Sequence, residues 1–165
     1  MHVVSISSLK GGVGKTTVTL GLASAAFAAN LRLNVADVLA NPKLKTVRQA
    51  IAPAGWSAPG HAPIDVMIGS PSAVNFDGPH PTAREVWRLE EALATVEDEY
   101  DLVLIDCAPS LNALTRTAWA ASDRVVVVTE PGLFSVAAAD RALRAIEEVR
   151  RGLSPRLQPL GLIIN

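Results

Sequence analysis

The chain lacks the features that mark several classes of protein. Its one cysteine, Cys107, cannot form an internal disulfide, which argues against a disulfide-stabilised secreted domain. No apolar run approaches the roughly twenty residues that a membrane-spanning helix needs, and the N-terminus has no signal-peptide layout. The net charge of −1 gives no overall indication of nucleic-acid binding. These absences lead us to expect a protein of the reducing cytoplasm, with no visible membrane anchor.

The composition instead describes one globular domain. A chain of 165 residues with 49% hydrophobic and 19% charged residues has enough apolar side chains for a sizeable core. Apolar segments rich in β-branched residues alternate with amphipathic ones, which is typical of a parallel sheet covered by helices on both faces. The strand candidates are residues 3–7, 64–68, 102–105, 124–129 and 160–164.

Signals for helix starts lie between the later strands. Thr82 and Glu85 form a capping box. Two stretches rich in proline and glycine, residues 52–63 and 71–81, are expected to be loops. The helices are expected to begin near Thr82, Ser110 and Ser135.

The helix predicted over residues 135–151 carries several arginines. Asp140 with Arg144, and Glu147 with Arg151, are spaced four residues apart on the side opposite the apolar positions. This pattern favours a solvated, salt-bridged face, and DNA contact by the arginines is the alternative.

A glycine-rich segment follows the first strand candidate and precedes a helical pattern over residues 16–29. Strand, glycine-rich turn and helix, in this order, are the context of a phosphate-binding P-loop. Glycines let consecutive backbone N–H groups point at a phosphate, and the helix N-terminus adds partial positive charge. A glycine-rich turn with a surface lysine is the alternative. The segment consists of Lys10, Gly11, Gly12, Val13, Gly14, Lys15, Thr16 and Thr17.

Two side chains of this segment complete the predicted ATP or ADP site. Lys15 would reach the β- and γ-phosphates, and the Thr16 hydroxyl would ligate Mg²⁺. The expected fold is therefore an α/β, P-loop NTPase-like fold, with a mostly parallel sheet between two helical layers.

Lys10 narrows the interpretation to one family. Residues 10–17 resemble the deviant Walker A motif of the ParA/Soj/MinD group of partitioning and positioning ATPases. In that group the first lysine crosses an ATP-bound dimer to the partner's nucleotide, which implies the same role for Lys10 beside the catalytic Lys15. The resemblance also implies a homodimer on ATP binding, nonspecific DNA binding, a ParB-like activating protein and a cytoplasmic, nucleoid-associated location.

A second match covers residues 100–111, which resemble the Walker B segment of ParA proteins. Four apolar residues that end in Asp106 describe a strand buried on both faces with a carboxylate at its C-terminal end. By the resemblance, Asp106 would hold the metal through a water or through Thr16. The alternative is that Asp106 caps the next helix, for which Ser110 is the better candidate.

Three further residues complete the predicted nucleotide contacts. Glu130 and Pro131 follow the fourth strand, where relatives have a loop at the edge of the nucleotide. Asn165 matches, by the resemblance, an asparagine that contacts the adenine. The helices that bind DNA or membranes in relatives follow this residue, so we expect the DNA-binding determinants to lie largely beyond the chain.

One family motif has no clear counterpart. ParA-like proteins carry Asp-x-Asp-Pro-Gln after the P-loop helix, and Asp37 is the residue here that could supply the first carboxylate. However, Asn34 is a good N-cap, and Asp37 would then occupy the third helical position, where negative charge suits the helix dipole. We therefore favour a helix-cap role for Asp37. One strand and its switch loop are expected to be absent near residues 29–33 of this single domain.

These observations leave two functions from different classes. The first is a ParA-like ATPase that acts as an ATP-dependent dimerisation switch in chromosome or plasmid partitioning, with weak and partner-stimulated hydrolysis. The second is a nucleotide-binding interaction protein with negligible hydrolysis, because the switch carboxylates are missing. A MinD-like positioning ATPase is a further alternative. A P-loop enzyme acting on small molecules is disfavoured, because no substrate constellation is visible.

Overall fold

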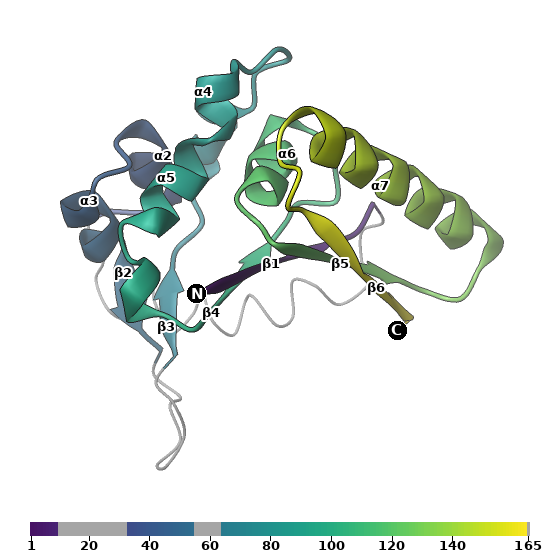
Figure 1. Cartoon of the computed structure of the whole chain (residues 1–165), viewed down its shortest axis with the longest axis horizontal. Helices are drawn as coiled ribbons and strands as arrows, with labels where there is room; N and C mark the ends of the chain where they lie inside the picture. The colour runs from purple at the N-terminus through teal and green to yellow at the C-terminus, as the bar shows by residue number, and fades with distance from the viewer. Residues whose placement is uncertain (10–32, 55–63, 165) are drawn as a thin grey trace.

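The core of the fold is a parallel sheet of four strands in the order β4-β1-β5-β6. In the computed structural model, the described residues are 1–9, 33–54 and 64–164. Figure 1 shows helices α6 and α7 on one side of this sheet. A mostly parallel central sheet with packed helices confirms the predicted P-loop NTPase-like fold. Its strands are β1 (His2–Ser7), β4 (Leu102–Asp106), β5 (Arg124–Thr129) and β6 (Gln158–Ile164).

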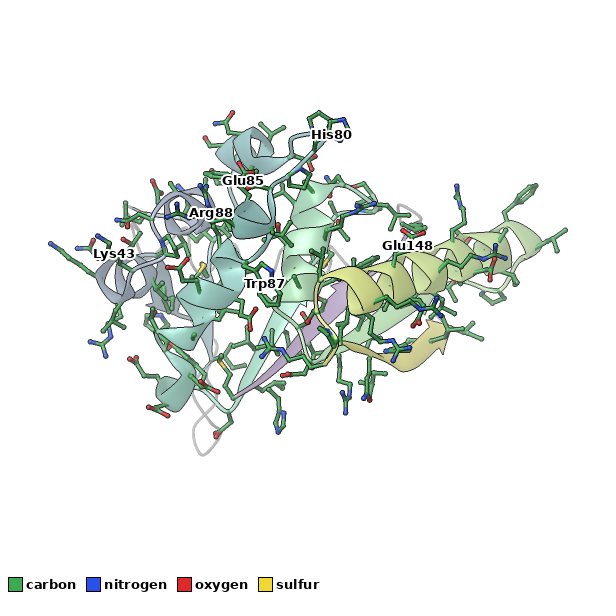
Figure 2. The ribbon with its side chains drawn as sticks, turned by 45° about the horizontal axis from the view of Figure 1, so that its top comes forward. Lys43, His80, Glu85, Trp87, Arg88 and Glu148 are labelled. Carbon is green, nitrogen blue, oxygen red and sulfur yellow. The ribbon has the colours of Figure 1, made fainter. Side chains whose placement is uncertain are left out.

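The remaining elements form the helices and a small second sheet. Strands β2 (Ile51–Pro53) and β3 (Asp65–Met67) pair antiparallel beside helices α2 and α3 (Figure 1). Trp87 joins α4 to α5 (Figure 2). The helices are α2 (Val35–Ala40), α3 (Leu44–Gln49), α4 (Ala83–Val86), α5 (Arg88–Ala94), α6 (Ala113–Ala120) and α7 (Leu133–Gly152), with 3-10 turns η1 (Pro71–Phe76) and η2 (Glu97–Glu99).

Most sequence-based boundaries agree with the structure, and four do not, one of which is the start of α6 at Ala113 and not near Ser110. All five strand candidates are strands, and Thr82 caps α4 in a reciprocal capping box with Glu85. Strand β2 occupies the start of the region expected to be loop, because it gains hydrogen bonds from β3, a distant partner. The 3-10 turn η1 lies in the other expected loop, where the Ser70 hydroxyl accepts a hydrogen bond from the Ser72 amide. Helix α7 begins two residues earlier than predicted, after Gly132.

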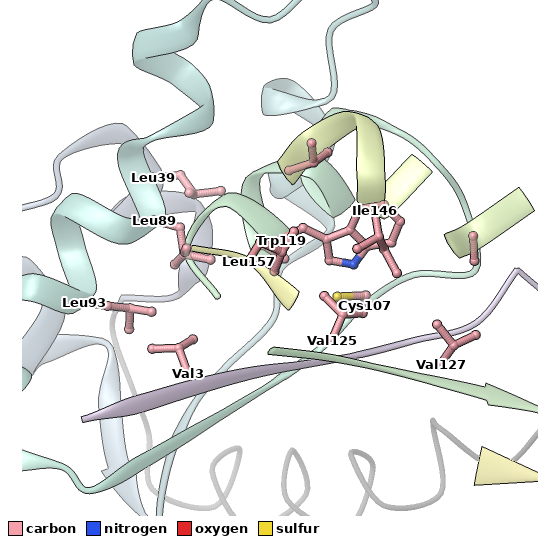
Figure 3. Packing of buried hydrophobic residues seen from close by; sticks show 14 of the residues in the cluster. Val3, Leu39, Leu89, Leu93, Cys107, Trp119, Val125, Val127, Ile146 and Leu157 are labelled. Carbon is pink, nitrogen blue, oxygen red and sulfur yellow. The ribbon is translucent and has the colours of Figure 1, made fainter. Parts of the chain in front are cut away.

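The main hydrophobic core lies between the parallel sheet and helices α5, α6 and α7 (Figure 3). Trp119 of α6 is completely buried, and Ile146 of α7 is 1% exposed. They pack over Val125 and Val127, whose side chains rise from the same face of β5. Burial of these large apolar groups is the main force that fixes α6 and α7 on the sheet.

A second cluster stabilises the small sheet. Val38 of α2, Val47 of α3 and Ala92 of α5 are fully buried together, and Ile51 and Met67 of the hairpin pack against them. Helix α5 thus takes part in both clusters, because its Leu89 and Leu93 belong to the main core.

Strand β4 differs from its prediction in burial. Leu102 and Leu104 are 54% and 58% exposed, whereas Val103 and Ile105 pack against the main cluster. The prediction that this strand is buried on both faces is therefore wrong for the described structure. Since side chains alternate along a strand, the two leucines point away from the face that α6 and α7 cover. The helix predicted over residues 16–29 lies outside the described residues.

The arginines of α7 form the predicted ion pairs. Arg144 lies 2.8 Å from the Asp140 carboxylate, and Glu147 binds both Arg150 and Arg151 at 2.7 and 2.6 Å. These hydrogen bonds lower the pKa of Glu147 to about 2. The pairing supports a solvated, charge-balanced face for this part of the helix.

Tyr100 links the small sheet to the start of β4. Its hydroxyl donates a hydrogen bond of 2.8 Å to the Asp65 carboxylate on β3. Burial, followed by the hydrogen bond to Asp65, raises the pKa of Tyr100 to about 12. Because the folded-state pKa lies above the unfolded value of about 10, this link stabilises the fold fully below pH 10 and loses its effect as the pH rises through 12.

Tyr100 is the only tyrosine, so an ultraviolet absorbance titration reports on this residue alone. We expect a midpoint near pH 12 while far-ultraviolet circular dichroism shows a folded chain. In Asp65→Asn the midpoint should fall but stay above about 10, since burial remains. A wild-type midpoint at the ordinary tyrosine value would contradict the link.

Candidate nucleotide-binding site

Three neighbouring parallel strands end at the same edge of the sheet. Ile6 of β1 lies beside Asp106 of β4, and Ser7 lies beside Val127 of β5. In open parallel sheets, ligands bind in the crevice outside the carboxyl ends of the strands. The structure therefore brings Asp106 next to the point where β1 leads into the glycine-rich segment.

The end of β1 is anchored in the core. Ser7 is fully buried and Ser8 is 1% exposed, and the Ser5 hydroxyl lies 2.8 Å from the Ser122 hydroxyl. Packing thus fixes the chain up to Leu9, the last described residue before the predicted P-loop. The predicted phosphate ligands, residues 10–17, lie outside the described residues.

Asp106 is an exposed carboxylate at this edge. The helix that follows is capped by Asn112, whose side-chain oxygen accepts a hydrogen bond of 3.0 Å from the Thr115 amide. The alternative that Asp106 caps this helix is therefore wrong, and so is the choice of Ser110. Asn112 caps the helix because its side-chain amide donates a hydrogen bond of 2.7 Å to the Asp77 carboxylate, which fixes the side chain. The two residues are far apart in sequence.

The chemistry of Asp106 suits a magnesium ion held together with a nucleotide. Mg²⁺ prefers oxygen ligands and usually combines one or two carboxylates with substrate phosphates and water. No group of three or more metal-ligating side chains occurs among the residues that the structure describes. A single carboxylate at the phosphate edge matches this mode, in which the phosphates supply the other charged ligands.

Glu130 and Pro131 lie at the same edge, in the turn that connects β5 to α7. Thr129 ends β5 beside Ile164 of β6. The next residue after Ile164, Asn165, is outside the described part of the chain. The structure thus brings Glu130 and Pro131 to the predicted edge and places the end of β6 beside them.

Asp37 lies in a helix cap. Its carboxylate accepts a hydrogen bond of 2.9 Å from the Asn34 amide, and the Asn34 side chain accepts one of 2.9 Å from the Ala36 amide. Both halves of a capping box are present. The structure confirms the cap interpretation over the switch interpretation.

One feature of this edge escaped the sequence analysis. Leu133 and Phe134, in the first turn of α7, are 84% and 89% exposed. The helical periodicity begins only at Ser135, so the two preceding residues read as connecting loop. An apolar pair directly after a proline-glycine turn was the available signal.

No helix among the described residues is long and apolar enough to cross a membrane.

Comparisons with known proteins agree with this geometry. A family model described as an AAA domain matches residues 64–159. The chromosome partitioning protein ParA of Caulobacter vibrioides is 33% identical, over all of this chain and 69% of that protein. The chromosome-partitioning ATPase Soj of Thermus thermophilus is 32% identical, over 98% of this chain and 68% of that protein.

A solved structure shares the fold. Cobyrinic acid a,c-diamide synthase from Mycobacterium smegmatis, crystallised with ADP and magnesium, superposes with a TM-score of 0.80 at 21% identity, covering 99% of this chain and 74% of that one. At this identity the likeness concerns the fold alone.

The alignment with the Caulobacter relative also contains more positions than this chain has residues. It runs over 193 positions, whereas this chain has 165 residues, so at least 28 positions hold no residue of this chain. The alignment nevertheless covers the whole chain at 33% identity, and the family model matches more than half of the chain. The chain therefore belongs to the ParA family of chromosome-partitioning ATPases.

Proposed function

We propose that this protein is an ATP-dependent dimerisation switch of the partitioning type. The observation that carries the proposal is that Asp106 lies beside the end of β1, the strand that precedes the deviant Walker A segment in the sequence. In this proposal, ATP closes a homodimer, the dimer binds DNA of any sequence at the nucleoid, and a ParB-like protein stimulates hydrolysis and release.

Each residue of the site has a distinct role. The backbone amides of residues 11–17 and the Lys15 ammonium bind the β- and γ-phosphates. Thr16 and Asp106 would hold Mg²⁺, which neutralises phosphate charge when bound. Lys10 reaches the nucleotide of the partner subunit, and Glu130, Pro131 and Asn165 border the nucleoside.

A specific observation favours slow hydrolysis. Asp37 is committed to a capping box, and at least 28 positions of the Caulobacter alignment have no counterpart here. The cap role leaves Asp37 unavailable as a switch carboxylate, and the unmatched positions leave room for the proposal that the switch segment is missing. The second candidate function, a nucleotide-dependent binding protein with negligible turnover, follows if hydrolysis stays at background.

Gel filtration with light scattering tests the switch. We expect wild-type protein to be monomeric alone and dimeric with Mg²⁺ and a nonhydrolysable ATP analogue. Lys10→Ala should raise the dimer dissociation constant by roughly 30-fold or more, because a buried phosphate charge loses its partner. Lys43→Ala is the matched control, since Lys43 is an exposed lysine that makes no capping bond at the start of α3 (Figure 2).

Two further outcomes decide between the candidates. A wild-type monomer under every condition would exclude the switch. ATP turnover that rises with DNA and a ParB-like protein would support the partitioning ATPase, whereas dimerisation without turnover would support the binding protein.

A further inference from the structure

The first turn of α7 exposes a compact apolar patch that the nucleotide site does not use. Leu133, Phe134 and Val136 are 84%, 89% and 65% exposed, and we call these three residues the α7 patch. Leu133 and Val136 are three residues apart, so they lie on neighbouring positions of one helical face. Apolar side chains exposed together in this way often mark an interaction surface.

The patch is not part of the core packing of α7. The buried stripe of the helix begins at Ser135 and continues through Ala139 and Ala142. The patch residues lie off this stripe, so the fold of the described residues is complete without covering them. None of the described residues buries these three side chains, so they are available for a contact with another molecule.

Its position points to the dimer. The turn at residues 130–132 leads from the carboxyl end of β5 into the patch, and Ser7 of β1 lies beside Val127 of the same strand. The patch thus extends the edge at which the proposed function places the nucleotide and the second subunit. No charged residue occurs from Pro131 to Ala139. A contact across a two-fold axis sets the same surface patch of both subunits against itself, and an uncharged patch can make such a contact without like-charge repulsion.

The size of the patch indicates a conditional contact. A stable dimer buries about 800 Å² on each partner, which is far more than three side chains provide. The patch alone therefore cannot hold two copies together and must act with a larger interface. Nucleotide-bridged closure supplies that interface only when ATP is bound.

We propose that the α7 patch packs against a second copy of this chain in the ATP-bound dimer, as an apolar contact beside the nucleotide. This inference rests on the proposed function. In this proposal Leu133, Phe134 and Val136 stabilise the ATP-bound dimer without contacting the nucleotide.

The double variant Leu133→Ser/Phe134→Ser tests the contact. Its monomer should bind a fluorescent ATP analogue within about twofold of wild type, while the dimer dissociation constant with Mg²⁺ and the nonhydrolysable analogue rises by roughly 30-fold. Val74→Ser is the matched control, because Val74 is 66% exposed on η1, almost the same as Val136. Thermal unfolding of both variants should match wild type, since none of these side chains is buried.

A cross-link gives a second readout. The native cysteine, Cys107, is 5% exposed, so Phe134→Cys creates one accessible thiol. A short bis-maleimide should join two copies in the presence of the analogue and Mg²⁺ only, and Val74→Cys should stay uncoupled.

The outcomes separate the patch from the switch. If wild type never dimerises, the proposed function fails and the patch inference with it. If wild type dimerises and the double variant dimerises equally well, the switch stands and the patch inference is overturned. An unchanged dimer with lost stimulation by a partner protein, or with lost binding to anionic vesicles, would likewise overturn it by assigning the patch to that partner.

Discussion

Trp119→Ala should lower the free energy of unfolding by about 3–5 kcal/mol, because Trp119 is among the largest fully buried side chains of the described residues. Trp119 is 0% exposed and lies at the centre of the main cluster, between Ile146 of α7 and Val125 of β5 (Figure 3). Removal of the indole leaves a cavity beneath α7. Typical domains are stable by about 5–15 kcal/mol, so the variant approaches the limit of folding.

Urea unfolding followed by far-ultraviolet circular dichroism measures this loss. Trp87→Ala is the matched control, because Trp87 is a half-buried residue at the junction of α4 and α5 (Figure 2), and its cost should be less than half as large. Equal losses in the two variants would show that Trp119 does not dominate the core.

Trp119→Phe separates packing from hydrogen bonding. The indole Nε1 is buried and has no hydrogen-bond partner among the described residues. A phenyl ring keeps most of the apolar contacts and removes the unpaired donor, so we expect a cost of about 1 kcal/mol. This milder variant also keeps the comparison usable if Trp119→Ala is insoluble.

Asp106→Asn should remove most of the magnesium-dependent gain in nucleotide affinity. The exposed Asp106 carboxylate lies beside the end of β1, and no competing helix-cap role occupies it. Loss of a group that holds or orients a metal ligand typically weakens the metal-dependent step by about 10- to 100-fold. Binding of the analogue without Mg²⁺ should stay near the wild-type value, because the phosphate ligands are intact.

Isothermal titration calorimetry with and without Mg²⁺ measures both affinities. Asp101→Asn is the matched control, since Asp101 precedes the opposite end of β4. Its backbone carbonyl accepts a hydrogen bond of 2.7 Å from the His2 amide, and this bond does not depend on the side chain. The same affinity gain from Mg²⁺ in Asp106→Asn and wild type would exclude Asp106 as a metal-site residue.

The sequence predicted those elements whose signals are local. The β-branched run at β5, the Thr82 cap and the capping role of Asp37 each depend on residues close together in the chain. The structure agrees at all three. Propensity and helix capping are local interactions, so neighbouring residues suffice to predict them.

The errors share a different cause, which is dependence on distant partners. Asn112 caps α6 because Asp77, 35 residues earlier, holds its side chain, whereas the sequence analysis preferred Ser110 to Asp106 and did not consider Asn112. Strand β2 is short and contains Pro53, and it forms because β3 completes its pairing. The exposure of Leu104 reflects which face α6 and α7 cover, and composition alone does not contain that information.

Helix α5 has a mechanical consequence for the molecule. Its Leu89 and Leu93 seal the interior beside the parallel strands, while its Ala92 closes the interior of the hairpin region. The same short helix therefore contributes buried side chains to both hydrophobic clusters. We expect a ligand that displaces the β2–β3 hairpin to disturb α5 as well, and with it the packing of the cluster that contains Val3 of β1.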